Sequence, residues 1–325
     1  MIIRPELQAL RSDDTPQRHA QAEMHRLAAQ WRASRIGAEL GEALIAYAHG
    51  DALAHLPPLA RLLAPGDPAA LRLTGEFIQR YIAAIAADHW GQVPFPSKLD
   101  DSTATIVLGA AGNAALIVQA IDGSGLRRRQ PTLTASFSPG ETHDHVLAGT
   151  ATARLVELRG ESTDRAELVE TPCALAPGHT ARRDGTRATL LIDVVPSTLV
   201  LLRLQRRPAT GSVTREFRLD DGTLAHQAAG NPRDSRFELA AALLGRMGRS
   251  DAAPLLAAMA EEQGGVSLRW QSLKECLGLD TAAGFAALGR IAARASDPLA
   301  APAQALREQL TQTYPQLAGA AACPA

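Results

Sequence analysis

A series of short apolar runs in the middle of this 325-residue chain constrains its fold more than any other feature. The runs are four to eight residues long and lie between residues 103 and 227: Thr105–Leu108, Ala114–Ile121, Thr132–Phe137, Ala151–Leu158, Leu168–Leu175, Ala188–Val195 and Thr198–Leu204. Turn-forming pairs separate them: Gly112-Asn113, Asp122-Gly123, Pro139-Gly140, Pro177-Gly178, Asp184-Gly185 and Asp221-Gly222. Short strands at regular spacing with such turns predict an antiparallel β-sandwich or a small barrel.

Helical periodicity occupies the chain on both sides of this strand-rich stretch. In Glu23–Ala33 and Ile36–His49 apolar residues recur at spacings of three and four, which is the signature of one buried helix face. Asp67 is a residue type that caps helices, and Pro68 after it predicts the first turn of a further helix. Beyond the strands we expect five more helices: Ser235–Met247, Asp251–Glu262, Leu268–Leu277, Thr281–Ala293 and Leu299–Thr313.

These segments together predict the α+β class, with a central antiparallel β-sandwich or barrel flanked by N- and C-terminal α-helical regions. We expect a helical region at residues 1–98, a barrel domain at 99–230 and a C-terminal helical region at 231–325 with a disordered tail. The Asp297-Pro298 helix start and the segment Leu268–Leu273 resemble HEAT-type helical repeats. A plain helical bundle is the alternative.

The charge balance argues against a nucleic-acid or membrane partner. The formal net charge is −1, so no global field attracts nucleic acid or an anionic membrane. No apolar run approaches the roughly 18 residues of a membrane span. The chain start is charged at Arg4 and Glu6, so we also expect no signal peptide.

The cysteine and lysine content suggests where the protein works. Cys173, Cys276 and Cys323 are dispersed and form no CxxC pair, which favours free thiols in a reducing cytoplasm. Lys98 and Lys274 are the only lysines, and the abundance of Arg and Ala suggests GC-rich coding, as in many bacteria.

The strongest chemical signal is the tetrapeptide Thr142–His145. Two histidines at spacing two on a strand point to the same face, and paired imidazoles can hold a divalent metal ion. The alternative is that His143 and His145 are surface residues beside the Pro-Gly turn. Asp144 points away from both histidines and is expected to be solvated, and Glu141 is expected to lie in the turn.

The segment Pro139–His145, with Pro177–His179 further on, resembles the cupin superfamily of double-stranded β-helix barrels. That resemblance implies a metal centre inside the barrel with His143, His145 and His179 as its ligands. Such a site favours iron, manganese, zinc, nickel or copper. The sequence departs from the cupin pattern because Ala148 and Gly149 stand where a ligand Glu is usual.

A second resemblance, within the same barrel class, is to Fe(II)/2-oxoglutarate oxygenases of the aspartyl/asparaginyl β-hydroxylase kind. It lies in the order of His145, Arg154, His179 and Arg187, the last of which opens the apolar run Ala188–Asp193. The resemblance implies that the two histidines hold Fe(II). Arg187 would pair with the 2-oxoglutarate carboxylate through its planar fork of donors, and Arg154 is a further co-substrate candidate.

Three functional hypotheses follow from these patterns. The first is a cupin-like metal-dependent oxygenase that acts on a small or peptide-borne substrate, with Fe(II) and 2-oxoglutarate as the cofactors that the second resemblance implies. The second is a metal-free cupin-like module that senses a ligand or serves as a scaffold. The third places the function in the helices, with a partner protein or a second copy of this chain, as a homodimer, bound there. His226 is a reserve metal ligand.

Overall fold

The computed structural model describes residues 12–162, 164–208, 213–230 and 232–317, so the predicted disordered tail lies largely outside the described residues. The chain divides into two compact units. The first unit comprises residues 1–133, 140–160 and 167–207, and the second comprises residues 134–139, 161–166 and 208–325. Among the described residues, no helix combines the length and apolarity needed to cross a membrane.

The first unit begins with helices, which confirms the predicted helical start. They are α2 (Thr15–Ala33), α3 (Arg35–His49), the 3₁₀ turn η1 (Leu53–His55), α4 (Pro57–Leu62) and α5 (Ala69–Ala87). Ser34 caps α3 by accepting a hydrogen bond from the Gly37 amide, and Gly50 ends that helix in the left-handed region at φ 115°. Asp67 accepts from the Ala69 amide at 2.8 Å just before α5, but the N-cap position of that helix is Pro68 and not Asp67 as predicted.

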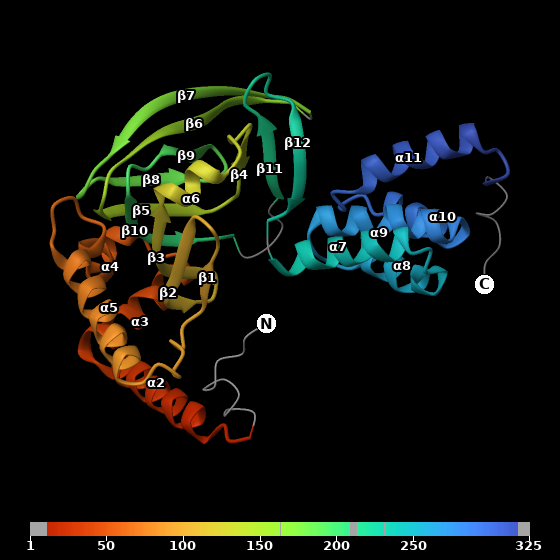
Figure 1. Ribbon diagram of the computed structural model, residues 1–325. Coiled ribbons are helices and arrows are strands. Elements are labelled where there is room, and N and C mark those ends of the chain that lie inside the picture. The colour runs from red at the N-terminus through yellow and green to blue at the C-terminus, as the bar shows by residue number, and fades with distance from the viewer. Residues whose placement is uncertain (1–11, 163, 209–212, 231, 318–325) are drawn as a thin grey trace. The chain divides into compact units, whose positions relative to one another are not determined.

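Two sheets follow in the first unit. The six-stranded sheet is antiparallel, in the order β1 (Ser97–Leu99), β2 (Thr103–Ala111), β3 (Ala114–Asp122), β10 (Thr198–Arg206), β5 (Glu141–Ala148) and β8 (Thr180–Asp184). The three-stranded sheet has the order β7 (Ala166–Leu175), β6 (Ala151–Glu161) and β9 (Ala188–Val194), and the short helix α6 (Gly123–Arg128) follows β3 (Figure 1). The α+β prediction with antiparallel sheets is therefore confirmed.

The central strands β10 and β5 of the six-stranded sheet are largely buried on both faces. Leu202 and Leu204 of β10 pack with Tyr47 and other residues of the N-terminal helices. Leu199 and Leu201 of the same strand pack with residues of the three-stranded sheet. Because side chains alternate along a strand, each residue of β10 and of its neighbour β5 belongs either to the helix-facing side or to the interior between the sheets.

The second unit contains a small sheet and the C-terminal helices. Its elements are β4 (Thr134–Phe137), β11 (Val213–Arg218), β12 (Leu224–Ala229), α7 (Pro232–Arg246), η2 (Ser250–Ala252), α8 (Ala253–Glu261), α9 (Val266–Leu279), α10 (Thr281–Ala292) and α11 (Ala300–Thr313). The strands pair antiparallel in the order β12-β11-β4. The five C-terminal helices were expected at nearly these bounds, whereas β11 and β12 carry too few apolar residues to have been predicted.

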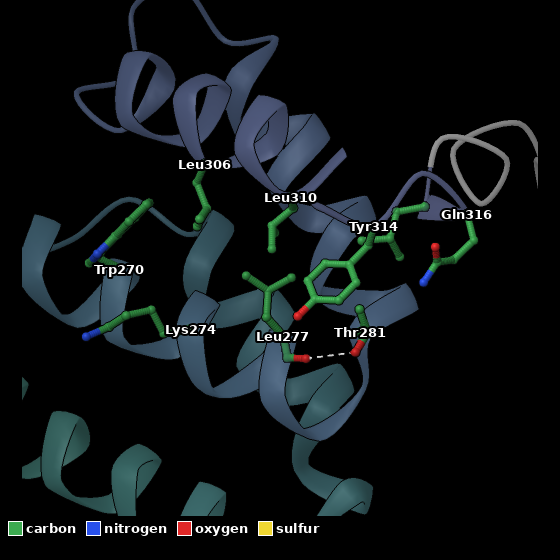
Figure 2. Close-up of a pocket in the computed structure, with 9 residues that line it drawn as sticks. Trp270, Lys274, Leu277, Thr281, Leu306, Leu310, Tyr314 and Gln316 are labelled. Atoms are coloured by element: carbon green, nitrogen blue, oxygen red, sulfur yellow. Dashed lines mark hydrogen bonds between the residues drawn. The ribbon is translucent and has the colours of Figure 1, made fainter. Parts of the chain in front are cut away.

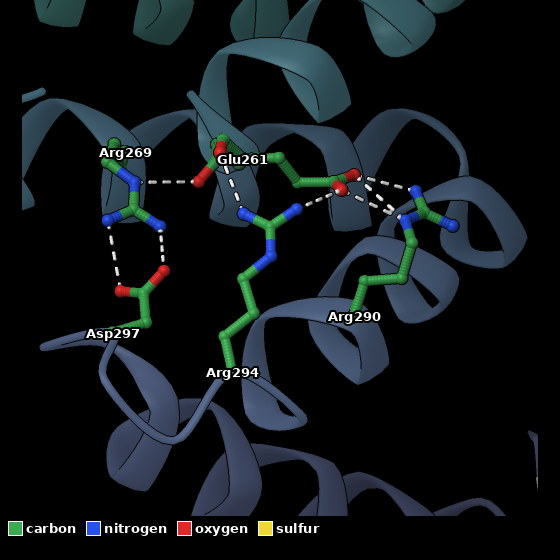
Figure 3. Close-up of polar contacts among 6 residues, drawn as sticks. Glu261, Arg269, Arg290, Arg294 and Asp297 are labelled. Carbon is green, nitrogen blue, oxygen red and sulfur yellow. Dashed lines mark hydrogen bonds and ion pairs between the residues drawn. The ribbon is translucent and has the colours of Figure 1, made fainter. Parts of the chain in front are cut away.

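Polar contacts fix the loops between α8, α9 and α11 (Figure 3). Arg269 donates to both carboxylate oxygens of Asp297, at 3.0 and 2.5 Å, and to the carbonyl of Ala260 at 2.9 Å. Glu261 accepts from Arg290 and Arg294. The Arg269–Asp297 pair is over nine-tenths buried, so it is shielded from solvent in a way that surface ion pairs are not.

Candidate functional site

The register of β5 decides which of its polar side chains share a face. His143 lies opposite Leu204 and His145 opposite Leu202, and both leucines pack against the N-terminal helices. Asp144 lies opposite Arg203 and two positions before Val146, which packs in the interior between the sheets. The two histidines therefore face the helices, while Asp144 faces the interior.

The burial and the bounds of this strand correct three expectations about its side chains. His143 and His145 are buried at 8% and 4% exposure, so they are not surface residues beside a turn. Asp144 is 4% exposed and is not solvated, because the strand is covered on both faces. Glu141 is the first residue of β5 and not part of the turn.

Glu141 lies at the centre of a cluster of polar side chains on the helix-facing side of β5. Its carboxylate accepts from the Tyr47 hydroxyl at 3.1 Å and from Arg206 at 2.9 Å, and Arg182 lies 2.7 Å from it. The Nε2 atom of His143 lies 3.0 Å from Glu141 Oε1, but this buried nitrogen makes no hydrogen bond of acceptable geometry within the described chain. At that distance from a carboxylate oxygen Nε2 must carry the ring proton, because two lone pairs would repel, so the contact is a poorly aligned N–H···O approach.

The protonation states of this cluster follow from burial and charge. Burial lowers the pKa of His143, and the nearby Glu141 carboxylate only partly opposes this, so the imidazole is neutral near pH 7. Burial alone would raise the pKa of Glu141, but His143, the Tyr47 hydroxyl and Arg182 together lower it. Burial and the adjacent Glu141 carboxylate raise the pKa of Tyr47.

His145 joins β5 to α4. Its Nδ1 lies 2.7 Å from the carbonyl oxygen of Leu62, an acceptor only, so Nδ1 carries the proton. In the neutral ring, Nε2 then holds the lone pair. Metal-ligating histidines use the same tautomer, so the hydrogen bond to Leu62 is compatible either with a structural link or with a ligand.

The structure does not bring the predicted third ligand to this pair. Thr180, and not His179, lies opposite His145, and the His179 carbonyl accepts from the Val146 amide at 2.9 Å. His179 therefore lies one residue before the position that pairs with His145, and its side chain is exposed. Across the described ranges, no group of three or more His, Cys, Asp or Glu side chains could hold a metal ion, so these residues do not fit a three-histidine centre.

The predicted co-substrate arginines lie elsewhere in the first unit. Arg154 on β6 donates to Asp193 at 2.8–3.1 Å and is paired with Glu170, so its guanidinium is already engaged. Arg187 is an exposed residue of the turn between β8 and β9. His226 is an exposed residue of β12 in the second unit.

A buried charge cluster occupies the interior instead. Arg203 donates to both oxygens of Asp144, from Nε at 2.6 Å and from Nη2 at 3.0 Å, and Nη2 of Arg183 donates to the same carboxylate. The side chain of Arg183 is 8% exposed. Its Nη1 is buried and has no hydrogen-bond partner in the part of the chain that the structure describes.

One carboxylate against two guanidiniums leaves this interior cluster with one uncompensated positive charge. Burial alone would raise the pKa of Asp144, but Arg203 and Arg183 hold it below its usual value. Burial alone would lower the pKa of Arg203, and Asp144 raises it above its usual value. Asp144 and Arg203 are therefore both charged, and the buried Nη1 of Arg183 beside them offers a donor to an anion.

The arginines of this cluster were not identified from the sequence. Arg203 stands between Leu202 and Leu204, and a charge inside such an apolar strand signals a buried ion pair. Arg183 carries no such signal, because its neighbours Arg182 and Asp184 make the segment look solvated.

No family profile and no curated protein matches this chain. The solved structures that it resembles are cupin-fold proteins. The cupin domain of Drosophila melanogaster CENP-C is 12% identical with a TM-score of 0.27, covering 35% of this chain and 76% of that one. KdgF from Halomonas is 12% identical with a TM-score of 0.23, covering 35% and 89%. The Fe(II) form of HppE is 12% identical with a TM-score of 0.25, covering 34% and 56%.

Proposed function

We propose that the first unit is a metal-free ligand-binding module that takes a small anion into the interior between its two sheets. The observation that carries this proposal is the buried Nη1 of Arg183, which has no acceptor among the described residues although its partner Nη2 is bound to Asp144. The ligand class is a carboxylate or an oxoanion, whose paired oxygens match a guanidinium fork.

The free-energy cost of leaving Nη1 of Arg183 unpaired supports an acceptor beside that atom. A buried donor without a partner costs about 1–3 kcal/mol, and more when it is charged. Asp144 does not relieve this cost in the structure, because it accepts from Nη2 of Arg183 and from Arg203 but not from Nη1 of Arg183. An anion beside Arg183 would satisfy the free donor and neutralise the excess charge together.

Thermal unfolding in the presence of small anions tests the proposal. Sulfate, inorganic phosphate and acetate are titrated at constant ionic strength. A ligand at about 100 times its Kd stabilises the folded state by about 2.7 kcal/mol. For a unit of this size that raises Tm by about 5–10 °C.

Two matched arginine variants locate the effect. In Arg183→Gln, Asp144 keeps its two hydrogen bonds from Arg203, so we expect a folded protein whose Tm no longer responds to the anion. Arg187→Gln, an exposed change four residues further on, should respond like the wild type. Absence of any anion-dependent shift in the wild type, or an equal shift in Arg183→Gln, would overturn the proposal.

The second candidate function is the metal-dependent oxygenase suggested by the sequence. One observation favours it: His145 is buried on the same strand face as His143, and its hydrogen bond to Leu62 gives it the tautomer that metal ligands use. Metal analysis after anaerobic reconstitution with iron tests it. A content below about a tenth of an equivalent in the wild type would exclude it, and so would equal content in a His143→Ala/His145→Ala variant.

A further inference from the structure

The second unit carries an open apolar groove between α9 and α11, with a volume of about 580 Å³ (Figure 2). Its walls are formed by Trp270 and Leu277 of α9 and by Leu306 and Leu310 of α11, with Leu317 beyond the end of α11. These side chains are half-buried, so they form neither the core of the unit nor an ordinary polar surface. A volume of this size lies in the range of small-molecule sites, about 300–1,000 Å³.

Helix geometry explains why the groove is continuous. Trp270, Lys274 and Leu277 stand at spacings of four and three on α9, and Leu306 and Leu310 stand four apart on α11. Each set therefore occupies one face of its helix. Both helices pack against α10, so their apolar faces border one channel and do not close on each other.

One positively charged side chain, that of Lys274, lies at the edge of the groove. Figure 2 shows Lys274 beside Trp270 on α9, while Tyr314 and Gln316 lie toward the other end. Lys274 is exposed and makes no ion pair or hydrogen bond with any described residue. It is also one of only two lysines in a chain whose other basic side chains are arginines, most of which are paired.

We propose that this groove binds a free long-chain fatty acid, with its acyl chain along the leucines and its carboxylate at Lys274. The apolar walls match an unbranched hydrocarbon, which gains about 0.8 kcal/mol for each methylene group it removes from water. The single unpaired ammonium matches a single carboxylate, and Tyr314 and Gln316 form a polar rim at the far end. The groove lies entirely in the second unit, so this inference is independent of the anion site in the first.

Displacement of a fluorescent polyene fatty acid by palmitate measures the binding, with both kept below micelle formation. Hexadecanol, which has the same chain without the charge, serves as the second competitor. We expect the wild type to prefer palmitate over hexadecanol about three- to fivefold, as an exposed ion pair allows. Lys274→Gln should lose that preference and keep hexadecanol binding, whereas Lys98→Gln, at an exposed position on β1, should keep the preference.

A wall variant tests the apolar part of the proposal. Leu310→Gln should weaken both competitors about tenfold or more, provided that its circular-dichroism melt shows a folded second unit. Absence of displacement in the wild type would overturn the proposal, and so would an unchanged palmitate preference in Lys274→Gln. Co-sedimentation with phosphatidylglycerol vesicles without displacement by free palmitate would also overturn it, since the groove would then serve a membrane lipid.

Discussion

Asp144 and Asp193 offer a comparison of carboxylate–guanidinium ion pairs in the interior and at the surface of the first unit. Each carboxylate accepts three hydrogen bonds from guanidinium groups, Asp144 from Arg203 and Arg183 and Asp193 from Arg154. The side chain of Asp144 is 5% exposed, whereas that of Asp193 is 32% exposed. The two carboxylates make the same number of guanidinium hydrogen bonds, and they differ in burial and in the number of arginines that supply those bonds.

We expect Asp144→Asn to destabilise the protein by about 3–5 kcal/mol, because it leaves the buried guanidinium of Arg183 and the half-buried one of Arg203 without a counter-charge. Asp193→Asn should cost less than about 1 kcal/mol, since solvent screens Arg154 and Glu170 still pairs with it. Urea unfolding followed by circular dichroism measures both free energies, with an unchanged m-value as the check on two-state behaviour.

The difference in unfolding free energy between the wild type and Asp144→Asn should also depend on pH. The folded-state pKa of Asp144 is lowered, so its contribution is fully present above the unfolded pKa of about 3.9. As the pH falls through that value toward the folded pKa, the contribution is lost, and the wild type should approach Asp144→Asn. Equal destabilisation by Asp144→Asn and Asp193→Asn near pH 7 would refute the reasoning from burial. A difference in unfolding free energy between the wild type and Asp144→Asn that grows as the pH falls would also refute it.

Three further changes test other contacts. Tyr47→Phe removes the hydroxyl that donates to Glu141 and should cost about 1 kcal/mol in urea unfolding. Burial lowers the pKa of His143, so its contribution to stability is present above the unfolded value of 6.5 and is lost as the pH falls below it. His143→Gln should therefore flatten the fall in stability between about pH 7 and pH 5, and an unchanged slope would contradict this. Asp297→Ala, which leaves Arg269 buried and unpaired, should unfold the second unit about 3–5 kcal/mol more easily, read from the fluorescence of Trp270.

Much of the fold could be predicted from the sequence because its elements have strong periods. β3 and β10 are mostly apolar, and α3 shows one clear apolar face, so their spans were close to those observed. By contrast, β8 reads Thr-Ala-Arg-Arg-Asp, and nothing local distinguishes it from a solvated loop. It is a strand because β5 lies beside it, which is a tertiary effect.

The candidate site was harder to predict because a face of a strand cannot be assigned from the strand alone. Alternation correctly places His143 and His145 together and Asp144 opposite, but both faces of β5 are buried. Which face meets the helices and which meets the other sheet depends on the pairing with β10. The resemblance to cupins placed the histidines in the interior, whereas the structure places Asp144 there, with arginines contributed by β8 and β10.

The position of β10 has a consequence for synthesis of the protein. β10 pairs with β3 across nine positions and with β5 on its other side, yet it is the last strand of its sheet to be translated. Until residue 206 has left the ribosome, β3 can form its hairpin with β2 but keeps an unpaired edge of apolar residues. The nascent chain thus carries an aggregation-prone edge for roughly eighty residues of elongation, several seconds or more at 5–20 residues per second, and a chain released before β10 should depend on chaperones.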